Sequence, residues 1–380
     1  MARRALGPAT LALTRAVAAL PEAPWLVACS GGADSLALAW AAHHVAGRRG
    51  TPVRAVAVDH GLRAGSDVVA AAVVARLAGF GLDAVAARVA VAGEGNVEAA
   101  ARASRYAALE ERAAPEEAIL LGHTLDDQAE TVLLGLARGS GPRSLAGMAP
   151  VRGRLLRPLL GLTRADTAAA CAELGLEPWQ DPMNEDPRFA RVRVRTAVLP
   201  LLERELGPGI AAALARTADL CRDAADAVDD LAAPLASVPE PACADLAAAT
   251  AGVRRAGLRA WLAARGATDL SARHVEAVEA LVTRWRGQRG VDVPGGRVTR
   301  SGTRLRFHPR GGEGNPGRVA PQSPGMPRVR PARRDSLSRW MQRRSAPSSP
   351  RSSTPTTRSR SGSPSWPPRS TRSTGARTCS

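Results

Sequence analysis

Short apolar runs alternate with longer Ala-rich stretches through the first 125 or so residues, and this alternation constrains the fold more than any other feature. The apolar runs cover 25–29, 53–58, 83–91 and 118–122, and helical spacing covers 36–45, 66–80 and 98–112. Strands that alternate with helices of this length predict βαβ units around a parallel sheet. The expected fold class is therefore α/β, a Rossmann-like domain with a parallel sheet.

Polar side chains follow three of these apolar runs at the point where each run ends. They are the segment 30–35, the pair Asp59 and His60, and the segment 123–127. In parallel sheets, ligands bind at the carboxyl ends of the strands. The sequence therefore predicts one site at one edge of the sheet.

The pattern changes after Pro200. Helical spacing covers 209–231, 244–264 and 271–285, and residues 291–307 suggest a small hairpin unit with its turn at 294–296. We therefore predict a catalytic domain over 1–205, a smaller and mainly helical domain over 206–308, and a tail over 309–380.

The tail carries most of the net charge. The chain has 52 basic residues, all of them arginine, against 35 acidic ones, and 15 of the arginines fall in residues 309–380 beside Glu313 and Asp335. The same segment holds 15 Ser and 12 Pro with little to bury, so we expect disorder. Two interpretations stay open: an arginine-rich RNA-binding tail, or the favoured one, an out-of-frame or read-through product of GC-rich DNA.

Residue usage excludes several kinds of chemistry. Without lysine there is no Walker A loop, lysine Schiff base or pyridoxal-phosphate site. Five cysteines with no C-x-x-C pair give neither a disulfide framework nor a zinc or iron–sulfur site, and they suit a reducing cytoplasm. No apolar run approaches about 20 residues, and charged residues and prolines interrupt a loosely lipoprotein-like N-terminus. We expect a cytoplasmic protein without a membrane partner.

The first motif lies between an expected strand and an expected helix. It consists of Ser30, Gly31, Gly32, Ala33, Asp34 and Ser35. The glycines let the backbone approach an anion at a helix N-terminus, and the serine hydroxyls can donate to phosphate oxygens. Asp34 would repel phosphate unless it held a cation, which implies Mg²⁺. The SGGxDS spacing resembles the pyrophosphate loop of ATP pyrophosphatases, which split ATP to AMP and pyrophosphate.

The second motif, Gly122 to Thr131 (GHTLDDQAET), lies at another strand-to-helix junction. A helix from about Leu125 would place Asp127 and Glu130 three residues apart on one face, with His123 just before it. Acidic residues in a first helical turn are also ordinary partners of the helix dipole. Between the two motifs, Arg102 and Arg105 would share a helix face, either to contact phosphates or as a solvated basic stripe.

Taken in order, the motifs are specific. SGGADS, VDHGLR, EAAARASRY, GHTLDDQAET, RGSGPRSLAGM, RPLLGLTR and WQDPMNEDPRFARVRVRTAVLPLLE together resemble the tRNA(Ile)-lysidine synthetase family from about Trp25 to Glu203. The helical part after them is similar to the tRNA-binding region of that family in its shorter form.

The resemblance implies an activity. Such enzymes adenylate the C2 oxygen of the wobble cytidine in an isoleucine tRNA with a CAU anticodon, and free L-lysine then displaces AMP to give lysidine, which changes codon reading from AUG to AUA. The site would hold ATP on residues 30–35 with Asp59 and His60, and Mg²⁺ on Asp34 and Glu130.

The resemblance also assigns further roles. Arg102, His123 and Asp127 would stabilise the adenylated base and orient the lysine ammonium, with Asp127 a candidate for deprotonating it. Contacts to RNA would come from Arg105 and from Arg191, Arg193 and Arg195, the last three of which could contact the nucleotide instead. The oligomeric state stays open, a homodimer included.

Two residues depart from the family pattern. Val192 stands where Asn is common, and Ser144 stands where Gly is usual. The nearest alternative enzyme is a tRNA base thiolase with the same loop, which would need a C-x-x-C or a paired catalytic cysteine. A non-catalytic RNA-binding protein on the same scaffold is the alternative from another class, and the intact motifs argue against it.

Overall fold

The structure is a computed structural model that describes residues 5–59, 65–89 and 97–310; within 97–103 it describes the backbone alone. The predictions for His60, for the Arg102 side chain and for nearly all of the tail lie outside the described residues. No helix among the described residues is long and apolar enough to cross a membrane.

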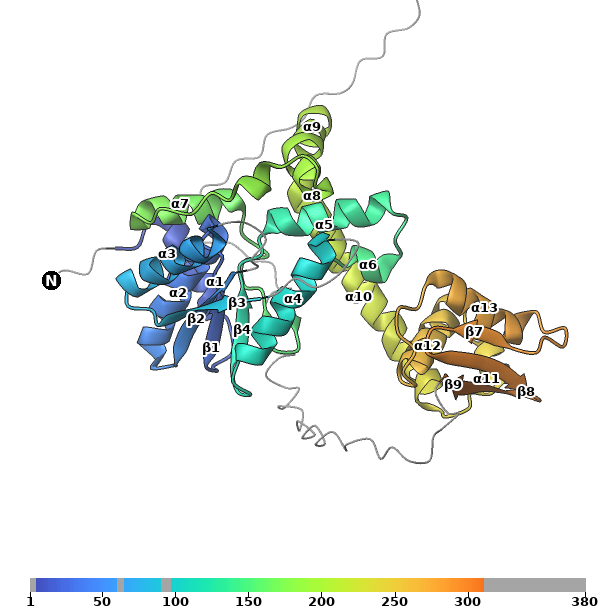
Figure 1. Ribbon diagram of the computed structural model, residues 1–380. Coiled ribbons are helices and arrows are strands. Elements are labelled where there is room, and N and C mark those ends of the chain that lie inside the picture. Colours follow the sequence, from blue (N-terminus) through green and yellow to red (C-terminus); the bar gives the residue numbers. More distant parts are fainter. Residues whose placement is uncertain (1–4, 60–64, 90–96, 311–380) are drawn as a thin grey trace, which may run out of the picture. The chain divides into compact units, whose positions relative to one another are not determined.

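A six-stranded sheet organises the first part of the chain (Figure 1). Its strands are β1 (Trp25–Ala28), β2 (Val53–Asp59), β3 (Ala84–Arg88), β4 (Ala118–Leu121), β5 (Val151–Arg152) and β6 (Leu155–Leu156). The order is β3-β2-β1-β4-β6-β5, and every neighbouring pair is parallel except β5 with β6. The predicted parallel sheet is confirmed, and the β5–β6 hairpin at its edge is an addition that sequence patterning did not predict.

The central strands are apolar because both of their faces are covered. Leu26 of β1, Val56 of β2, Ile119 of β4 and Leu109 of α4 belong to one buried cluster. The helices of this part are α1 (Pro8–Ala18), α2 (Ala33–Arg49), α3 (Ser66–Gly79), α4 (Val97–Arg112), α5 (Leu125–Ala137), α6 (Pro142–Leu145) and α7 (Arg164–Leu174), and α2, α3 and α4 pack on the strands. Helices α1, α2 and α7 pack against one another.

Strand β1 has β2 on one side and β4 on the other, so the chain order reverses beside it. Ligands bind at such a switch point in open α/β sheets. The loop after β1 and the loop after β4 meet there closely: a Cβ on Gly122 would lie 3.0 Å from the Asp34 carbonyl oxygen and 3.0 Å from Ser35 Cα.

A run of short helical segments follows α7. It comprises the 3-10 turn η1 (Pro182–Glu185), α8 (Ala190–Arg193), the π-helical turn η2 (Val194–Val198) and α9 (Leu199–Leu206). Helix α10 (Ile210–Ser237) comes next, and its Ile210, Ala211 and Leu214 pack on a cluster with Ala129 of α5.

The C-terminal part consists of α11 (Cys243–Ala248), α12 (Ala251–Ala263), α13 (Ala272–Thr283) and an antiparallel sheet of β7 (Val291–Val293), β8 (Gly296–Ser301) and β9 (Arg304–Pro309). The single helix expected over 244–264 is wrong. Ala249 and Thr250 adopt extended backbone conformations, which end α11 and begin α12. The expected hairpin unit is present with a third strand.

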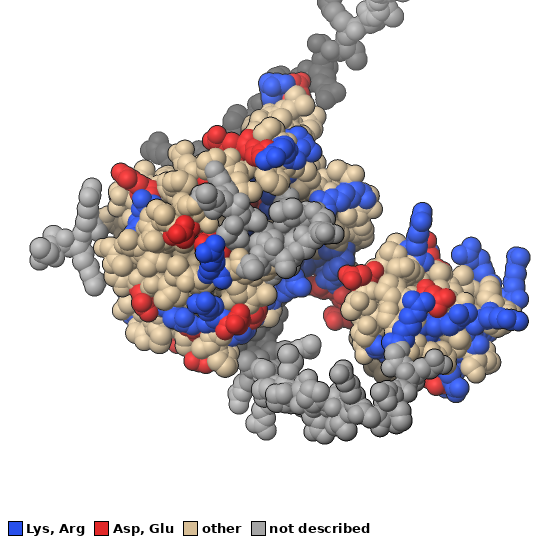
Figure 2. Space-filling model, viewed as in Figure 1, with Lys and Arg blue, Asp and Glu red and all other residues tan. Residues whose placement is uncertain are grey.

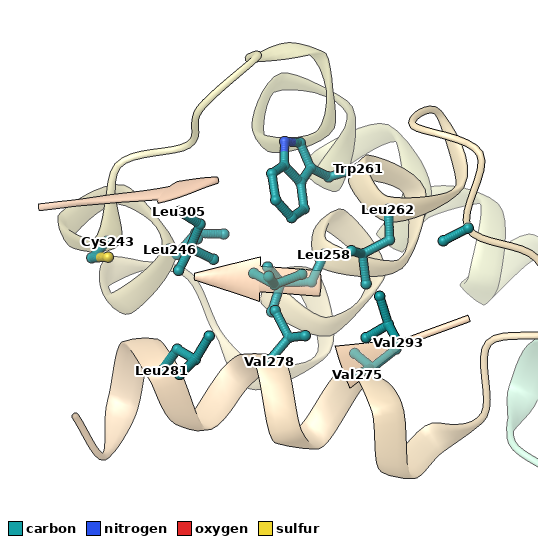
Figure 3. Close-up of a cluster of buried hydrophobic side chains, with 12 residues drawn as sticks. Cys243, Leu246, Leu258, Trp261, Leu262, Val275, Val278, Leu281, Val293 and Leu305 are labelled. Atoms are coloured by element: carbon teal, nitrogen blue, oxygen red, sulfur yellow. The ribbon is translucent and has the colours of Figure 1, made fainter. Parts of the chain in front are cut away.

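These elements enclose their own core, in which Trp261, Leu258, Val278 and Leu305 are buried (Figure 3). The Trp261 indole N–H donates to the Pro239 carbonyl at 3.1 Å, so the only polar atom of this buried ring has a hydrogen-bond partner.

We expect Trp261→Ala to lower the free energy of unfolding by about 3–5 kcal/mol, because it removes a fully buried aromatic side chain and leaves a cavity. Denaturant unfolding followed by circular dichroism measures this loss. The matched control is Trp285→Ala, since Trp285 is 37% exposed and should cost much less. Equal losses in the two variants would contradict the assignment of Trp261 to the core.

Candidate functional site

The loop after β1 has a fixed shape. Gly31 has a φ of +86°, and a Cβ there would lie 2.5 Å from a Val73 methyl carbon. The Ser30 N–H donates to the Ser35 hydroxyl oxygen at 3.1 Å, and that hydroxyl donates to the Gly32 carbonyl at 3.0 Å. The Trp179 N–H donates to the Gly31 carbonyl at 2.8 Å. The loop therefore leads into the N-terminus of α2 in one conformation, the arrangement that binds phosphate.

Helix α5 supplies the second half of the site. Thr124 caps it, and its N–H donates to Asp127 Oδ2 at 2.9 Å in a capping box. Because α5 begins at Leu125, as the spacing predicts, Asp127 and Glu130 lie one turn apart. Asp127 is 8% exposed and Glu130 is 0% exposed. Two carboxylates are thus withdrawn from water beside the loop after β1.

Arg164, the first residue of α7, neutralises these carboxylates. Its Nη1 lies 2.8 Å from Glu130 Oε1, its Nη2 contacts Asp127 Oδ1, and its Nε lies 3.8 Å from Asp34 Oδ2. Its backbone N–H donates to Asp126 Oδ2 at 2.8 Å. Sequence reasoning quoted the RPLLGLTR segment and gave this arginine no role. The available signal was a basic residue directly after the N-cap Thr163, within the Thr163–Asp166 capping box, where the helix dipole disfavours a cation.

Two further arginines reach Glu130 from the segment after α7. Arg195 Nε lies 2.8 Å from Glu130 Oε1, and Arg191 Nε lies 3.7 Å from Glu130 Oε2. Alternating Arg and Val residues form a helix here, so Arg191 and Arg195 share a face while Arg193 turns away and donates to the Pro187 and Arg188 carbonyls. The structure brings only two of the three predicted arginines to the carboxylates.

The surroundings shift the pKa values of Asp34 and Asp127 in opposite directions. Burial raises the pKa of Asp34 from 3.8 to about 6, although Thr167 donates a hydrogen bond to that carboxylate. Burial would also raise the pKa of Asp127, but the Arg164 guanidinium and the Thr124 N–H hold it below its usual value. Asp127 therefore stays ionised at neutral pH.

The remaining predicted residues come from the end of β2, from α4 and from the residues just before α5. His123 precedes the cap of α5, and Asp59 is 5% exposed at the end of β2, beside β1 in the sheet. Arg102 and Arg105 both lie on α4, and the Arg105 side chain is exposed. Of the two departures, Val192 is buried in α8 and Ser144 lies in the short helix α6.

The donor set of Asp34 and Glu130 fits Mg²⁺. Both offer hard carboxylate oxygens, and both lie within 4 Å of one cationic group, the Arg164 guanidinium. Among the described residues no three His, Cys, Asp or Glu side chains converge as a complete metal site. Mg²⁺ commonly takes one or two carboxylates together with substrate phosphates, and these two side chains suit that pattern.

Exposed arginines gather on the C-terminal part, where residues 238–310 contain thirteen arginines against six acidic residues. Figure 2 shows their blue side chains spread over this part of the surface. The exposed ones are Arg255, Arg259, Arg273, Arg284, Arg286, Arg289, Arg297, Arg304, Arg306 and Arg310. Such a density of guanidinium groups suits a phosphate backbone.

Comparison with known proteins gives consistent matches. Residues 9–202 match the family described as a PP-loop domain, and residues 242–306 match the TilS substrate binding domain. The chain is 51% identical to the tRNA(Ile)-lysidine synthase of Leifsonia xyli (76% of this chain, 91% of the relative) and 54% identical to that of Nocardia farcinica (71% and 85%). It is 52% identical to that of Salinispora arenicola (79% and 97%).

Among solved structures, the U34-tRNA thiolase NcsA from Methanococcus maripaludis aligns with a TM-score of 0.46 at 17% identity. The alignment covers 56% of this chain and 80% of the thiolase chain.

Gly122→Ala should weaken ATP binding at least about tenfold. The new methyl group would press on the backbone of Asp34 and Ser35, which cannot yield as a side chain can. Isothermal titration with ATP measures the loss. The control is Gly47→Ala in α2, where a Cβ meets nothing within 4 Å, and its affinity should match the parent. Unchanged affinity in Gly122→Ala would contradict the close approach of the two loops.

Asp34→Asn should stabilise the metal-free protein at pH 7.5 by about 1–3 kcal/mol. The folded pKa of about 6 lies above the ordinary 3.8, so an ionised Asp34 lowers stability above pH 6 and no longer does so below about pH 4. The gain should therefore shrink as the pH falls from 6 to 4. Denaturant unfolding in EDTA at several pH values measures it, and a gain independent of pH would refute the burial argument.

Proposed function

The chain belongs to the tRNA(Ile)-lysidine synthase family and is a ligase that acts on isoleucine tRNA and uses ATP, and we propose that free lysine is the amine and that Mg²⁺ accompanies the nucleotide. The observation that carries this proposal is the pairing, at one switch point, of a phosphate-binding loop with buried carboxylates Asp127 and Glu130. The loop suits an anionic nucleotide, and the carboxylates suit cations.

The reaction proceeds in two steps, adenylation of the cytidine and displacement of AMP by lysine. The C2 oxygen of the wobble cytidine attacks the α-phosphate of ATP, and the bond to pyrophosphate breaks. The lysine ammonium loses one proton to water, the neutral amine forms a bond to C2, the C2–O bond breaks, and AMP leaves with that oxygen. Adenylation turns a poor oxygen leaving group into a good one, so the protein has to align three substrates at one place.

We propose that residues 30–35 bind the pyrophosphate portion of ATP and that Asp34 and Glu130 hold Mg²⁺. When bound, the metal neutralises charge that develops on the departing pyrophosphate. The N-terminus of α2 contributes its backbone N–H groups to the same oxygens.

The proposed binding partner of the lysine ammonium is the fixed negative charge of Asp127. Asp127 has a lowered pKa and accepts hydrogen bonds on both of its oxygens, which makes it a weak base. An ammonium group with an ordinary pKa of about 10.4 is therefore oriented by Asp127 more readily than deprotonated by it. Arg102 and His123 are proposed to stabilise the adenylated base.

The thiolase alternative lacks support from the described cysteines. Cys29, Cys171 and Cys243 are buried and Cys221 is half-buried, and none is bonded to another. Burial raises the pKa of Cys171 to about 11 and also raises that of Cys29, so neither thiol is the thiolate that sulfur transfer needs.

The exposed arginines of residues 238–310 are the proposed tRNA surface, together with Arg191, Arg193 and Arg195 nearer the site. The cytoplasmic location and a homodimeric assembly stay predictions.

The test uses the full chain, ATP, Mg²⁺ and radiolabelled lysine with two isoleucine tRNA transcripts that differ only in a CAU or UAU anticodon. Label should be fixed on the CAU transcript alone. Asp34→Asn should lower the rate at least about 100-fold, and the exposed control Asp67→Asn on α3 should keep it. ATP split to AMP without label on either transcript would retain the nucleotide site and refute lysine as the amine.

A further inference from the structure

Arg164 occupies the least favourable position for a cation on α7. It is the first residue of that helix, where the unpaired N–H groups already carry partial positive charge. Its side chain is about three-quarters withdrawn from water, with an exposure of 26%. A cation in that position requires a strong local attraction, and the source is a group of carboxylates from two other helices.

The first turn of α7 collects those carboxylates. Arg164 contacts Asp127 and Glu130 of α5 and reaches Asp34 at the start of α2. Thr167, three residues further along, donates a hydrogen bond from its hydroxyl group to Asp34 Oδ1. Both proposed metal ligands are therefore held by α7, through side-chain contacts that involve the oxygens a metal ion would need.

The charges nearly balance as long as Arg164 stays in place. Three carboxylates (Asp34, Asp127 and Glu130) contact the guanidinium groups of Arg164, Arg191 and Arg195, and a fourth, Asp126, accepts a hydrogen bond from the Arg164 backbone N–H. A divalent cation is only weakly attracted to a group whose net charge is this small. It is also repelled by the Arg164 guanidinium, which lies between the proposed ligands Asp34 and Glu130. Without Arg164, four negative charges would face two positive ones, which favours a divalent cation.

We propose that Arg164 is a positioning residue that takes the place of Mg²⁺ in the nucleotide-free enzyme and makes metal binding depend on ATP. The inference rests on the proposed Mg²⁺ site. The guanidinium and the metal compete for Asp34 and Glu130, so the metal enters when Arg164 withdraws. The phosphates of ATP offer the guanidinium a new charge-assisted partner, and for that reason nucleotide and metal bind together.

The test measures Mn²⁺ binding by electron paramagnetic resonance on the full chain, with and without the α,β-methylene analogue of ATP, which cannot be split between those phosphates. In the parent protein the analogue should lower the Kd for Mn²⁺ at least about tenfold. Arg164→Gln should bind Mn²⁺ without the analogue at least about tenfold more tightly than the parent, so the effect of the analogue shrinks. The quantity compared is the ratio of the Kd for Mn²⁺ without the analogue to the Kd with it. A purely structural role of Arg164 would not change this ratio.

Two further variants complete the design. Arg54→Gln removes another arginine of the same domain that is ion-paired at 2.7 Å, to Glu117, and should behave as the parent. Arg164→Lys keeps a positive charge for folding but cannot hold three carboxylates at once, so its ratio should lie between the parent and Arg164→Gln.

The outcomes separate the two proposals. If Mn²⁺ binds to no variant even with the analogue, the Mg²⁺ site itself is refuted. If Mn²⁺ binds with the analogue but Arg164→Gln and Arg164→Lys both keep the parent ratio, only the role of Arg164 is refuted. Should Arg164→Gln fail to fold, the intermediate ratio of Arg164→Lys decides.

Discussion

A carboxylate with no contact to water determines the arrangement of this site. Glu130 is 0% exposed, and an ionised group so placed is stable only when cations and hydrogen-bond donors surround it. Arg164 comes from α7, and Arg191 and Arg195 come from the segment after it. Two regions distant in sequence from α5 thus contact one of its side chains, and the position of α7 in turn fixes Asp34 through Thr167.

This dependence explains why the site has a stability cost of its own. Burial opposes the ionised form of Asp34, and a cation at the N-terminus of α7 opposes the helix dipole. Neither cost would persist in a protein selected for stability alone. Both are understandable if the centre must accept a nucleotide and a metal ion that are absent from the free enzyme.

Most of the fold followed from the sequence because the signals were local. The apolar runs of β1, β2 and β4 and the SGGADS turn define strands and helix starts within a few residues, and the structure has them there. The break at Thr250 was not predicted, because the Ala-rich sequence has helical spacing on both sides of the break. The β5–β6 hairpin was not predicted either, since two-residue strands leave no periodicity.

The centre of the site was less predictable for a different reason. Asp34, Asp127 and Glu130 sit in recognisable motifs, whereas Arg164 stands in a segment whose spacing suggests only a helix start. Its importance comes from contacts 34 and 37 residues away along the chain, to Glu130 and Asp127. The three arginines of the same segment were predicted to act together, and the sequence does not show that the helix divides them, with Arg191 and Arg195 on Glu130 and Arg193 on backbone carbonyls.

The π-helical turn at Val194–Val198 affects how α9 is rotated relative to the arginines before it. A π turn behaves as one extra residue within an α-helix, and such turns occur often at functional sites. Each residue advances an α-helix by about 100°. A relative that lacks one residue here would have a regular helix, and its equivalent of α9 would be rotated by roughly that angle against the arginines. The number of residues in this short stretch therefore determines how far the apolar side chains of α9 are rotated about the helix axis relative to the arginines that contact Glu130.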